Sequence, residues 1–161
     1  MTVESDDDIQ GLKAAGEAVA TVLRRMLDAI RPGMTTLELD QMGERWLTEF
    51  GAKSAPRVMY NFPGATCISI NEQAAHGIPG DRVIARGDVL NVDVSAELDG
   101  YFADTGGTIV VPPATPQKTR LCHASRSSSP ATSGASRRGA WPSPGAVVQR
   151  RRAEIGQWSL R

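Results

Sequence analysis

Two aspartates, Asp93 and Asp104, lie in consecutive segments that are rich in apolar and β-branched residues. Asp93 stands within Leu-Asn-Val-Asp-Val at 90–94, where a charge is costly unless it is paired or bound to a metal ion. Asp104 follows in Gly-Tyr-Phe-Ala-Asp-Thr at 100–105. Close carboxylates repel each other, so such a pair favours a bridging cation. Metal binding is the chemistry that these residues suggest, whereas two aspartates alone also fit solvated strand ends.

The relative placement of the two aspartates depends on the turn between their segments. The stretches 89–97 and 101–111 predict two strands of a β-hairpin around Leu98-Asp99-Gly100. A two-residue turn at Leu98-Asp99 would place the aspartates directly opposite each other. A turn at Asp99-Gly100 would place them diagonally on the same face, and in either case their Cβ atoms would lie about 4.5–8 Å apart. A three-residue loop would put them on opposite faces and weaken the metal interpretation.

His76 is the third candidate, in a loop bounded by glycine and proline that follows a predicted strand at 65–71. Functional residues favour such loops, although a lone loop histidine is more often simply exposed. No Gly-x-Ser-x-Gly elbow is present, so the sequence does not support a Ser/His/Asp nucleophile.

Two amphipathic helices precede these segments, and each opens on a capping box. Ser5 with Asp8 begins the first helix, which a Pro-Gly pair ends, and Thr35 with Glu38 begins the second. The predicted order is two helices, a strand, a Gly/Pro-rich loop and a hairpin. The expected fold class is therefore α+β.

The overall net charge of zero hides a division along the chain. Residues 1–124 contain 11 Lys and Arg against 17 Asp and Glu, whereas residues 125–161 contain 7 Arg and a single Glu. The second region is rich in Ser, Arg, Ala, Gly and Pro and shows no helical or alternating periodicity. It fits a disordered basic tail that could touch nucleic acid. We favour a shifted reading frame of GC-rich coding DNA, because the change interrupts a domain.

Two cysteines, Cys67 and Cys122, form neither a disulfide framework nor a zinc motif. The acidic N-terminus is unlike a signal peptide, and no stretch has the length of a transmembrane helix. We therefore expect a cytoplasmic protein without membrane partners.

Several motifs together, in order and spacing, resemble the type I methionine aminopeptidases of peptidase family M24. The resemblance covers about residues 8–124, the first half of such an enzyme, and stops at Ala124 or Ser125. It rests on Pro32–Asp40, Ile68–Glu72, His76–Pro79, Gly87–Val94, Asp99–Tyr101 and Asp104-Thr105.

The resemblance implies the N-terminal half of a pita-bread fold, with two helices and a curved antiparallel sheet, followed by the irregular or disordered tail. It implies that Asp93 and Asp104 bind metal, with Asp104 bridging two divalent ions, which could be Co, Mn, Fe or Zn. His76 would contact the substrate. Phe62 and Cys67 fall where the methionine side-chain pocket is lined, and Met59 stands where an aromatic residue is more usual.

The family removes the initiator methionine from nascent proteins near the ribosome, using water activated by metal. It needs two aspartates, a histidine and two glutamates as ligands, and the only later His and Glu here are His123 and Glu154. We therefore expect a truncated chain, with no complete catalytic set and at most weak metal binding.

Two alternatives to the methionine aminopeptidase interpretation remain. A prolidase- or creatinase-type relative is disfavoured by the loop His76–Pro79. A non-enzymatic module that binds peptide, or RNA through the basic tail, is disfavoured by the retained pair of aspartates.

Overall fold

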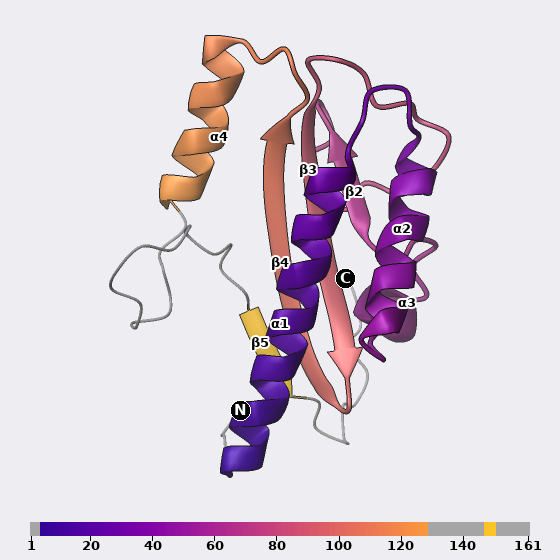
Figure 1. Cartoon of the computed structure of the whole chain (residues 1–161), viewed down its shortest axis with the longest axis vertical. Helices are drawn as coiled ribbons and strands as arrows, with labels where there is room; N and C mark the ends of the chain where they lie inside the picture. Colours follow the sequence, from indigo (N-terminus) through magenta and orange to yellow (C-terminus); the bar gives the residue numbers. More distant parts are fainter. Residues whose placement is uncertain (1–3, 129–146, 151–161) are drawn as a thin grey trace, which may run out of the picture.

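The computed structural model describes residues 4–128 and 147–150. Two long helices, α1 (Asp6–Ala29) and α2 (Thr36–Glu49), lie on one face of an antiparallel sheet, and a shorter α4 (Pro116–Ser128) lies beyond β4 (Figure 1). The other elements are β1 (Lys53–Ser54), α3 (Ala55–Tyr60), β2 (Cys67–Ile70), β3 (Val89–Leu98), β4 (Tyr101–Val110) and β5 (Val147–Arg150).

Both long helices begin where the sequence places them. Ser5 Oγ accepts a hydrogen bond from the Asp8 amide at 3.2 Å. The box at Thr35 and Glu38 is reciprocal, since the Glu38 amide donates to Thr35 Oγ1 at 3.1 Å and the Thr35 amide donates to Glu38 Oε2 at 2.7 Å. Local capping therefore sets these two starts.

Strand β3 is the centre of the sheet. It pairs with β1 and β2 along one edge and with β4 along the other, and all of these pairings are antiparallel. Leu98 faces Tyr101, so the turn consists of Asp99 and Gly100, with φ of 49° and 87°. Two successive positive φ values are typical of a type I′ hairpin turn. The hairpin is confirmed, with the two-residue turn at Asp99-Gly100.

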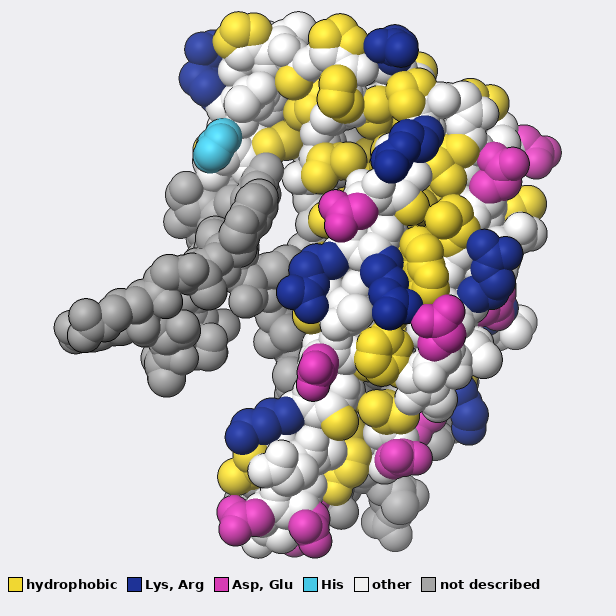
Figure 2. Space-filling view, viewed as in Figure 1, with side chains coloured by type: hydrophobic (Ala, Val, Ile, Leu, Met, Phe, Trp, Pro, Cys, Tyr) yellow, Lys and Arg dark blue, Asp and Glu magenta, His cyan; other side chains and the backbone are white. Residues whose placement is uncertain are grey.

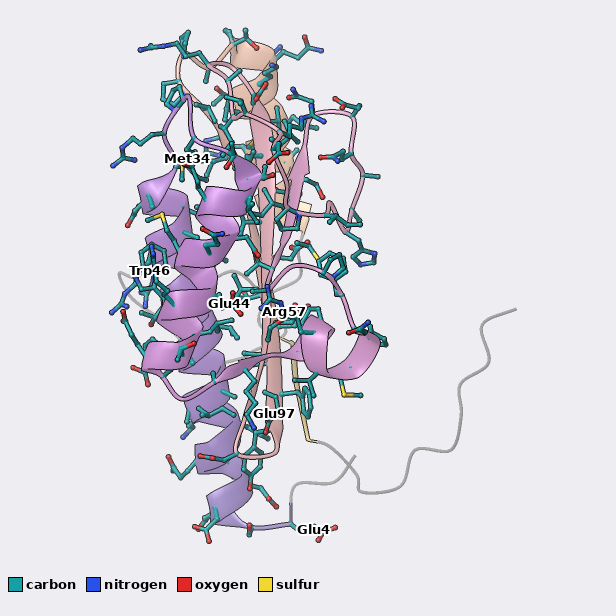
Figure 3. The ribbon with its side chains drawn as sticks, turned by 90° about the vertical axis from the view of Figure 1, so that its right-hand side faces the viewer. Glu4, Met34, Glu44, Trp46, Arg57 and Glu97 are labelled. Atoms are coloured by element: carbon teal, nitrogen blue, oxygen red, sulfur yellow. The ribbon has the colours of Figure 1, made fainter. Side chains whose placement is uncertain are left out.

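Burial alternates along β3 and defines two faces of the sheet. Leu90, Val92, Val94 and Ala96 are fully buried, and they pack with residues of α1 and α2 such as Leu23. Figure 3 shows α1 and α2 on this side, with α3 on the other. The residues between the buried ones on β3 point away from α1 and α2, and we call their side the open face.

The outer surface of the long helices carries mixed charge. Acidic and basic side chains are interspersed along it, with apolar side chains between them (Figure 2). Arg25 and Glu49 form an exposed ion pair across the two helices at 2.6 Å. Pairs of this kind add little stability. Within the described residues, no helix is long and apolar enough to cross a membrane.

One close approach ties the start of α1 to the hairpin. Tyr101 Oη donates to Asp8 Oδ1 at 3.0 Å, and a Cβ atom on Gly11 would lie 2.2 Å from Tyr101 Cε2.

We expect Gly11→Ala to destabilise the fold by about 1–3 kcal/mol despite the higher helix propensity of alanine, because the Tyr101 ring must move to make room for the added methyl group. Urea unfolding should show this loss of stability as a lower unfolding midpoint. Gly80→Ala is the control, because an added Cβ atom there would meet no atom within 4 Å. Equal unfolding midpoints for both variants would contradict the prediction.

Three features differ from the sequence expectation. Helix α3 was not predicted, although Ser54 precedes it as an N-cap and Pro56 lies in its first turn. Strand β2 is shorter than the predicted 65–71. Helix α4 runs past residue 124, and β5 pairs with the start of β4. Most of 125–161 lies outside the described residues, so the division of the chain at 124 stays a prediction.

Candidate functional site

The sheet register places Asp93 and Asp104 together on the open face. Asp93 faces Gly106 across the hairpin, and Asp104 faces Ser95. The two aspartates are therefore diagonal neighbours, with Cβ atoms about 7 Å apart. The two aspartates lie on one face of the sheet, as expected for either of the two-residue turns considered from the sequence. Its role in binding metal stays a prediction.

Each carboxylate accepts a hydrogen bond from a neighbour on the same face. Asn91 Nδ2 donates to Asp93 Oδ2 at 3.0 Å, and Ser95 Oγ donates to Asp104 Oδ1. Asp93 is half-buried whereas Asp104 is exposed. Burial raises the pKa of Asp93, the Asn91 hydrogen bond lowers it, and the charge of Asp104 raises it again. A cation between the carboxylates would relieve both the repulsion and the burial cost.

His76 reaches the same region from the loop between β2 and β3. It is exposed, with φ of 52°, and its charge lowers the pKa of Asp93. The next residue holds the loop against β2, since the Gly77 amide donates to Ser69 Oγ at 3.1 Å and Gly77 O accepts from the Ile68 amide at 2.9 Å. A Cβ on Gly77 would lie 2.1 Å from Ile68 O, so only glycine fits there.

Cys67 is the direct cross-strand partner of Asp93 and is buried. Burial, followed by the charges of Asp93 and Asp104, raises the pKa of the Cys67 thiol to about 11. Met59 lies near the end of α3, 36% exposed, and the half-buried Phe62 follows the helix. Helix α3 is on the open-face side of the sheet (Figure 3). The place of these three residues in a methionine pocket stays a prediction.

The thiol environment can be tested by alkylation. In a Cys122→Ser background, we expect Cys67 to react with iodoacetamide with an apparent pKa near 11, against about 9 in urea. At pH 9 the folded chain should react on the order of 50-fold more slowly, because the thiolate is the reactive form. Asp93→Asn should lower the apparent pKa. An apparent pKa near 9 in the folded protein would contradict the prediction.

Asp40 on α2 is a buried residue whose role the sequence reasoning missed. It is 1% exposed and accepts from the amides of Ala65 and Thr66, at 3.0 and 2.7 Å, and from Thr66 Oγ1 at 2.7 Å. These bonds fix the segment that leads into Cys67. The available signal was a carboxylate in a helix next to the buried Leu39, where a charge needs partners.

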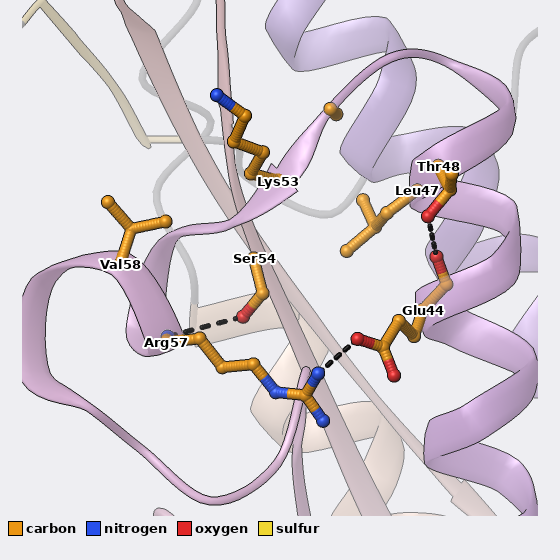
Figure 4. A pocket seen from close by; sticks show the side chains of 8 residues that line it. Glu44, Leu47, Thr48, Lys53, Ser54, Arg57 and Val58 are labelled. Atoms are coloured by element: carbon orange, nitrogen blue, oxygen red, sulfur yellow. Dashed lines mark hydrogen bonds and ion pairs between the residues drawn. The ribbon is translucent and has the colours of Figure 1, made fainter.

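A separate cavity of about 250 Å³ lies between α2, β1 and α3 (Figure 4). Its charged lining includes Glu44 and Arg57, which form an ion pair, and it contains none of the predicted site residues. Nowhere in 4–128 and 147–150 do three or more His, Cys, Asp or Glu side chains form a group that could hold a metal ion. The candidate site is the carboxylate pair on the open face, because the register brings Asp93 and Asp104 together near His76.

The sequence and the fold of this chain are similar to those of known proteins. The profile of metallopeptidase family M24 matches residues 10–144. The methionine aminopeptidase of Staphylococcus epidermidis is 50% identical over 123 residues, which are 76% of this chain and 49% of that protein. The crystal structure of methionine aminopeptidase from Thermotoga maritima has a TM-score of 0.75 at 29% identity, over 79% of this chain and 51% of that one.

The prolidase from Pyrococcus furiosus, at 21% identity and a TM-score of 0.64, shares the fold alone; the match covers 74% of this chain and 34% of that one. The chain thus spans about half the length of the curated relatives that it matches. The predicted class, α+β in the manner of one half of a pita-bread fold, is confirmed.

Proposed function

Because the chain belongs to metallopeptidase family M24, we propose that its open face is the metal-binding part of an aminopeptidase that removes the initiator methionine from nascent proteins. The substrates would be N-terminal Met peptides near the ribosome, in the cytoplasm. The observation that carries the proposal is the placement of Asp93 and Asp104 on one face, beside the loop of His76.

The residues present fit a divalent cation. Two carboxylates of like charge are diagonal neighbours on one face, and each has one oxygen in a side-chain hydrogen bond and a second oxygen available for a ligand. Oxygen donors of this kind accept Mn, Fe, Co or Zn, so the metal stays open. Bound metal would supply Lewis acidity for peptide hydrolysis.

The neighbouring side chains would bind and orient the peptide. His76 is exposed and held on an anchored loop, where it can donate to a substrate carbonyl. Cys67 is neutral at physiological pH because its pKa is about 11, so it offers an uncharged, polarisable wall to a thioether. Phe62 and Met59 would add apolar surface, as binding pockets for side chains require.

Metal binding by the 161-residue chain tests this proposal. We expect weak binding of Mn²⁺, with Kd on the order of 10⁻³ M, because two carboxylates leave most ligand positions to water. Water-proton relaxation during a Mn²⁺ titration measures it.

Asp93→Asn and Asp104→Asn should each abolish the relaxation change. Asp99→Asn is the matched control, since it removes the same charge from the exposed turn residue. Unchanged Mn²⁺ binding in both site variants would refute the metal role. Tight binding of two ions that needs both aspartates would refute the expectation of an incomplete site.

A further inference from the structure

A line of side chains crosses the open face from β4 to Asp93. Thr108 and Asn91 are direct cross-strand partners, and Thr108 Oγ1 donates to Asn91 Oδ1 at 2.8 Å. Asn91 Nδ2 in turn donates to Asp93 Oδ2 at 3.0 Å. An ionised carboxylate can only accept hydrogen bonds, so the NH2 group of Asn91, and not its carbonyl oxygen, must face Asp93. The carbonyl oxygen of Asn91 accepts the bond from Thr108, so both ends of the side-chain amide are held.

The second carboxylate has its own donor. Ser95 is the direct cross-strand partner of Asp104, and its hydroxyl donates to Asp104 Oδ1. The two aspartates therefore take their hydrogen bonds from two separate side chains of β3, Asn91 and Ser95. Each bond engages one oxygen of its carboxylate.

The orientation of Asp93 is visible in its contact with β4. A Cβ atom on Gly106 would lie 2.1 Å from Asp93 Oδ1, so this oxygen occupies the space that a side chain there would fill. Oδ1 thus points across the hairpin toward the strand that carries Asp104, while Oδ2 points toward Asn91. The Asn91 bond therefore fixes the orientation of the Asp93 carboxylate, with one oxygen directed toward β4.

We propose that Thr108, Asn91 and Ser95 are positioning residues that fix the orientation in which the carboxylates of Asp93 and Asp104 face a divalent cation. This inference rests on the proposed function and deepens it. Hydrogen bonds to metal-binding side chains orient them, and losing one typically weakens metal affinity about 10–100-fold.

The test uses the 161-residue chain, Mn²⁺ and two matched pairs of variants. Thr108→Val and Ser95→Ala remove a hydroxyl, whereas Thr108→Ser and Ser95→Thr keep it. We expect each hydroxyl-free variant to weaken Mn²⁺ binding about 10-fold, and each hydroxyl-bearing variant to stay within about 2-fold of the parent chain. Equal urea midpoints within each pair would separate positioning from a loss of fold.

A metal-free readout accompanies the titration. The side-chain amide protons of Asn91 should exchange faster with water in Thr108→Val than in Thr108→Ser, as seen by NMR. Unchanged amide exchange, or hydroxyl-free variants that bind Mn²⁺ like the parent chain while Asp104→Asn does not bind, would overturn the inference alone. Mn²⁺ binding that is insensitive to both aspartates would overturn the proposed function, and the inference with it.

Discussion

A chimera in which residues 1–124 of this chain replace the matching half of the Staphylococcus epidermidis methionine aminopeptidase should release methionine from a Met-Ala-Ser peptide. The two sequences are 50% identical over 123 residues, which make up 49% of that protein. The remainder of the relative would supply the second half of the site. Release of methionine in the presence of Mn²⁺ or Co²⁺, followed by mass spectrometry, measures the activity.

Asp104→Asn in the chimera should lower the rate by at least about 10³-fold, because a neutral amide no longer offers the charged oxygens that a metal centre needs. Asp99→Asn removes the same charge from the exposed hairpin turn, where φ is 49° and asparagine is well tolerated. This control should keep its activity. Equal activity of the Asp104→Asn and Asp99→Asn chimeras would exclude a catalytic role for Asp104.

The 161-residue chain by itself should release no measurable methionine. After Asp104, its only histidine and its only glutamate are His123 and Glu154, and neither lies in a motif that resembles the family's other ligands. Catalysis needs a general base opposite the bound metal as well as the metal ligands. If the chain cleaves at an ordinary rate, and its Asp104→Asn form does not, the expectation of a defective enzyme is wrong.

Asp40→Ala should lower the free energy of unfolding by about 3–5 kcal/mol, because it leaves three buried donors without their acceptor. The donors are the amides of Ala65 and Thr66 and the hydroxyl of Thr66. With an m value of about 2 kcal/mol/M, the urea midpoint should fall by about 2 M. Circular dichroism during urea titration measures the shift.

Thr66→Val is the matched control for Asp40→Ala. It removes only the hydroxyl bond and keeps the side-chain shape, so it should cost about 1 kcal/mol. Asp40→Asn should fall between the two, since its carbonyl oxygen still accepts while its amide group meets other donors. A loss for Asp40→Ala no larger than that for Thr66→Val would show that Asp40 does not hold the segment before β2.

The sequence by itself determined the features that depend on neighbours along the chain. The starts of α1 and α2 follow from the side chains of Ser5 and Thr35, each of which accepts a hydrogen bond from the backbone amide three residues further along. The common face of Asp93 and Asp104 follows from the two-residue period of strands, since either short turn keeps their parity. The motifs around these residues also carried the family resemblance.

Only the tertiary structure decided what depends on contacts between distant segments. It chose Asp99-Gly100 as the turn, placed Cys67 opposite Asp93, and joined Asn91 to Thr108. Pairing between separate strands is set by the packing of the whole sheet against its helices, and short sequence windows do not contain that packing. Asp40 shows the same limit, because its acceptor role exists only once the segment at 65–66 lies against α2.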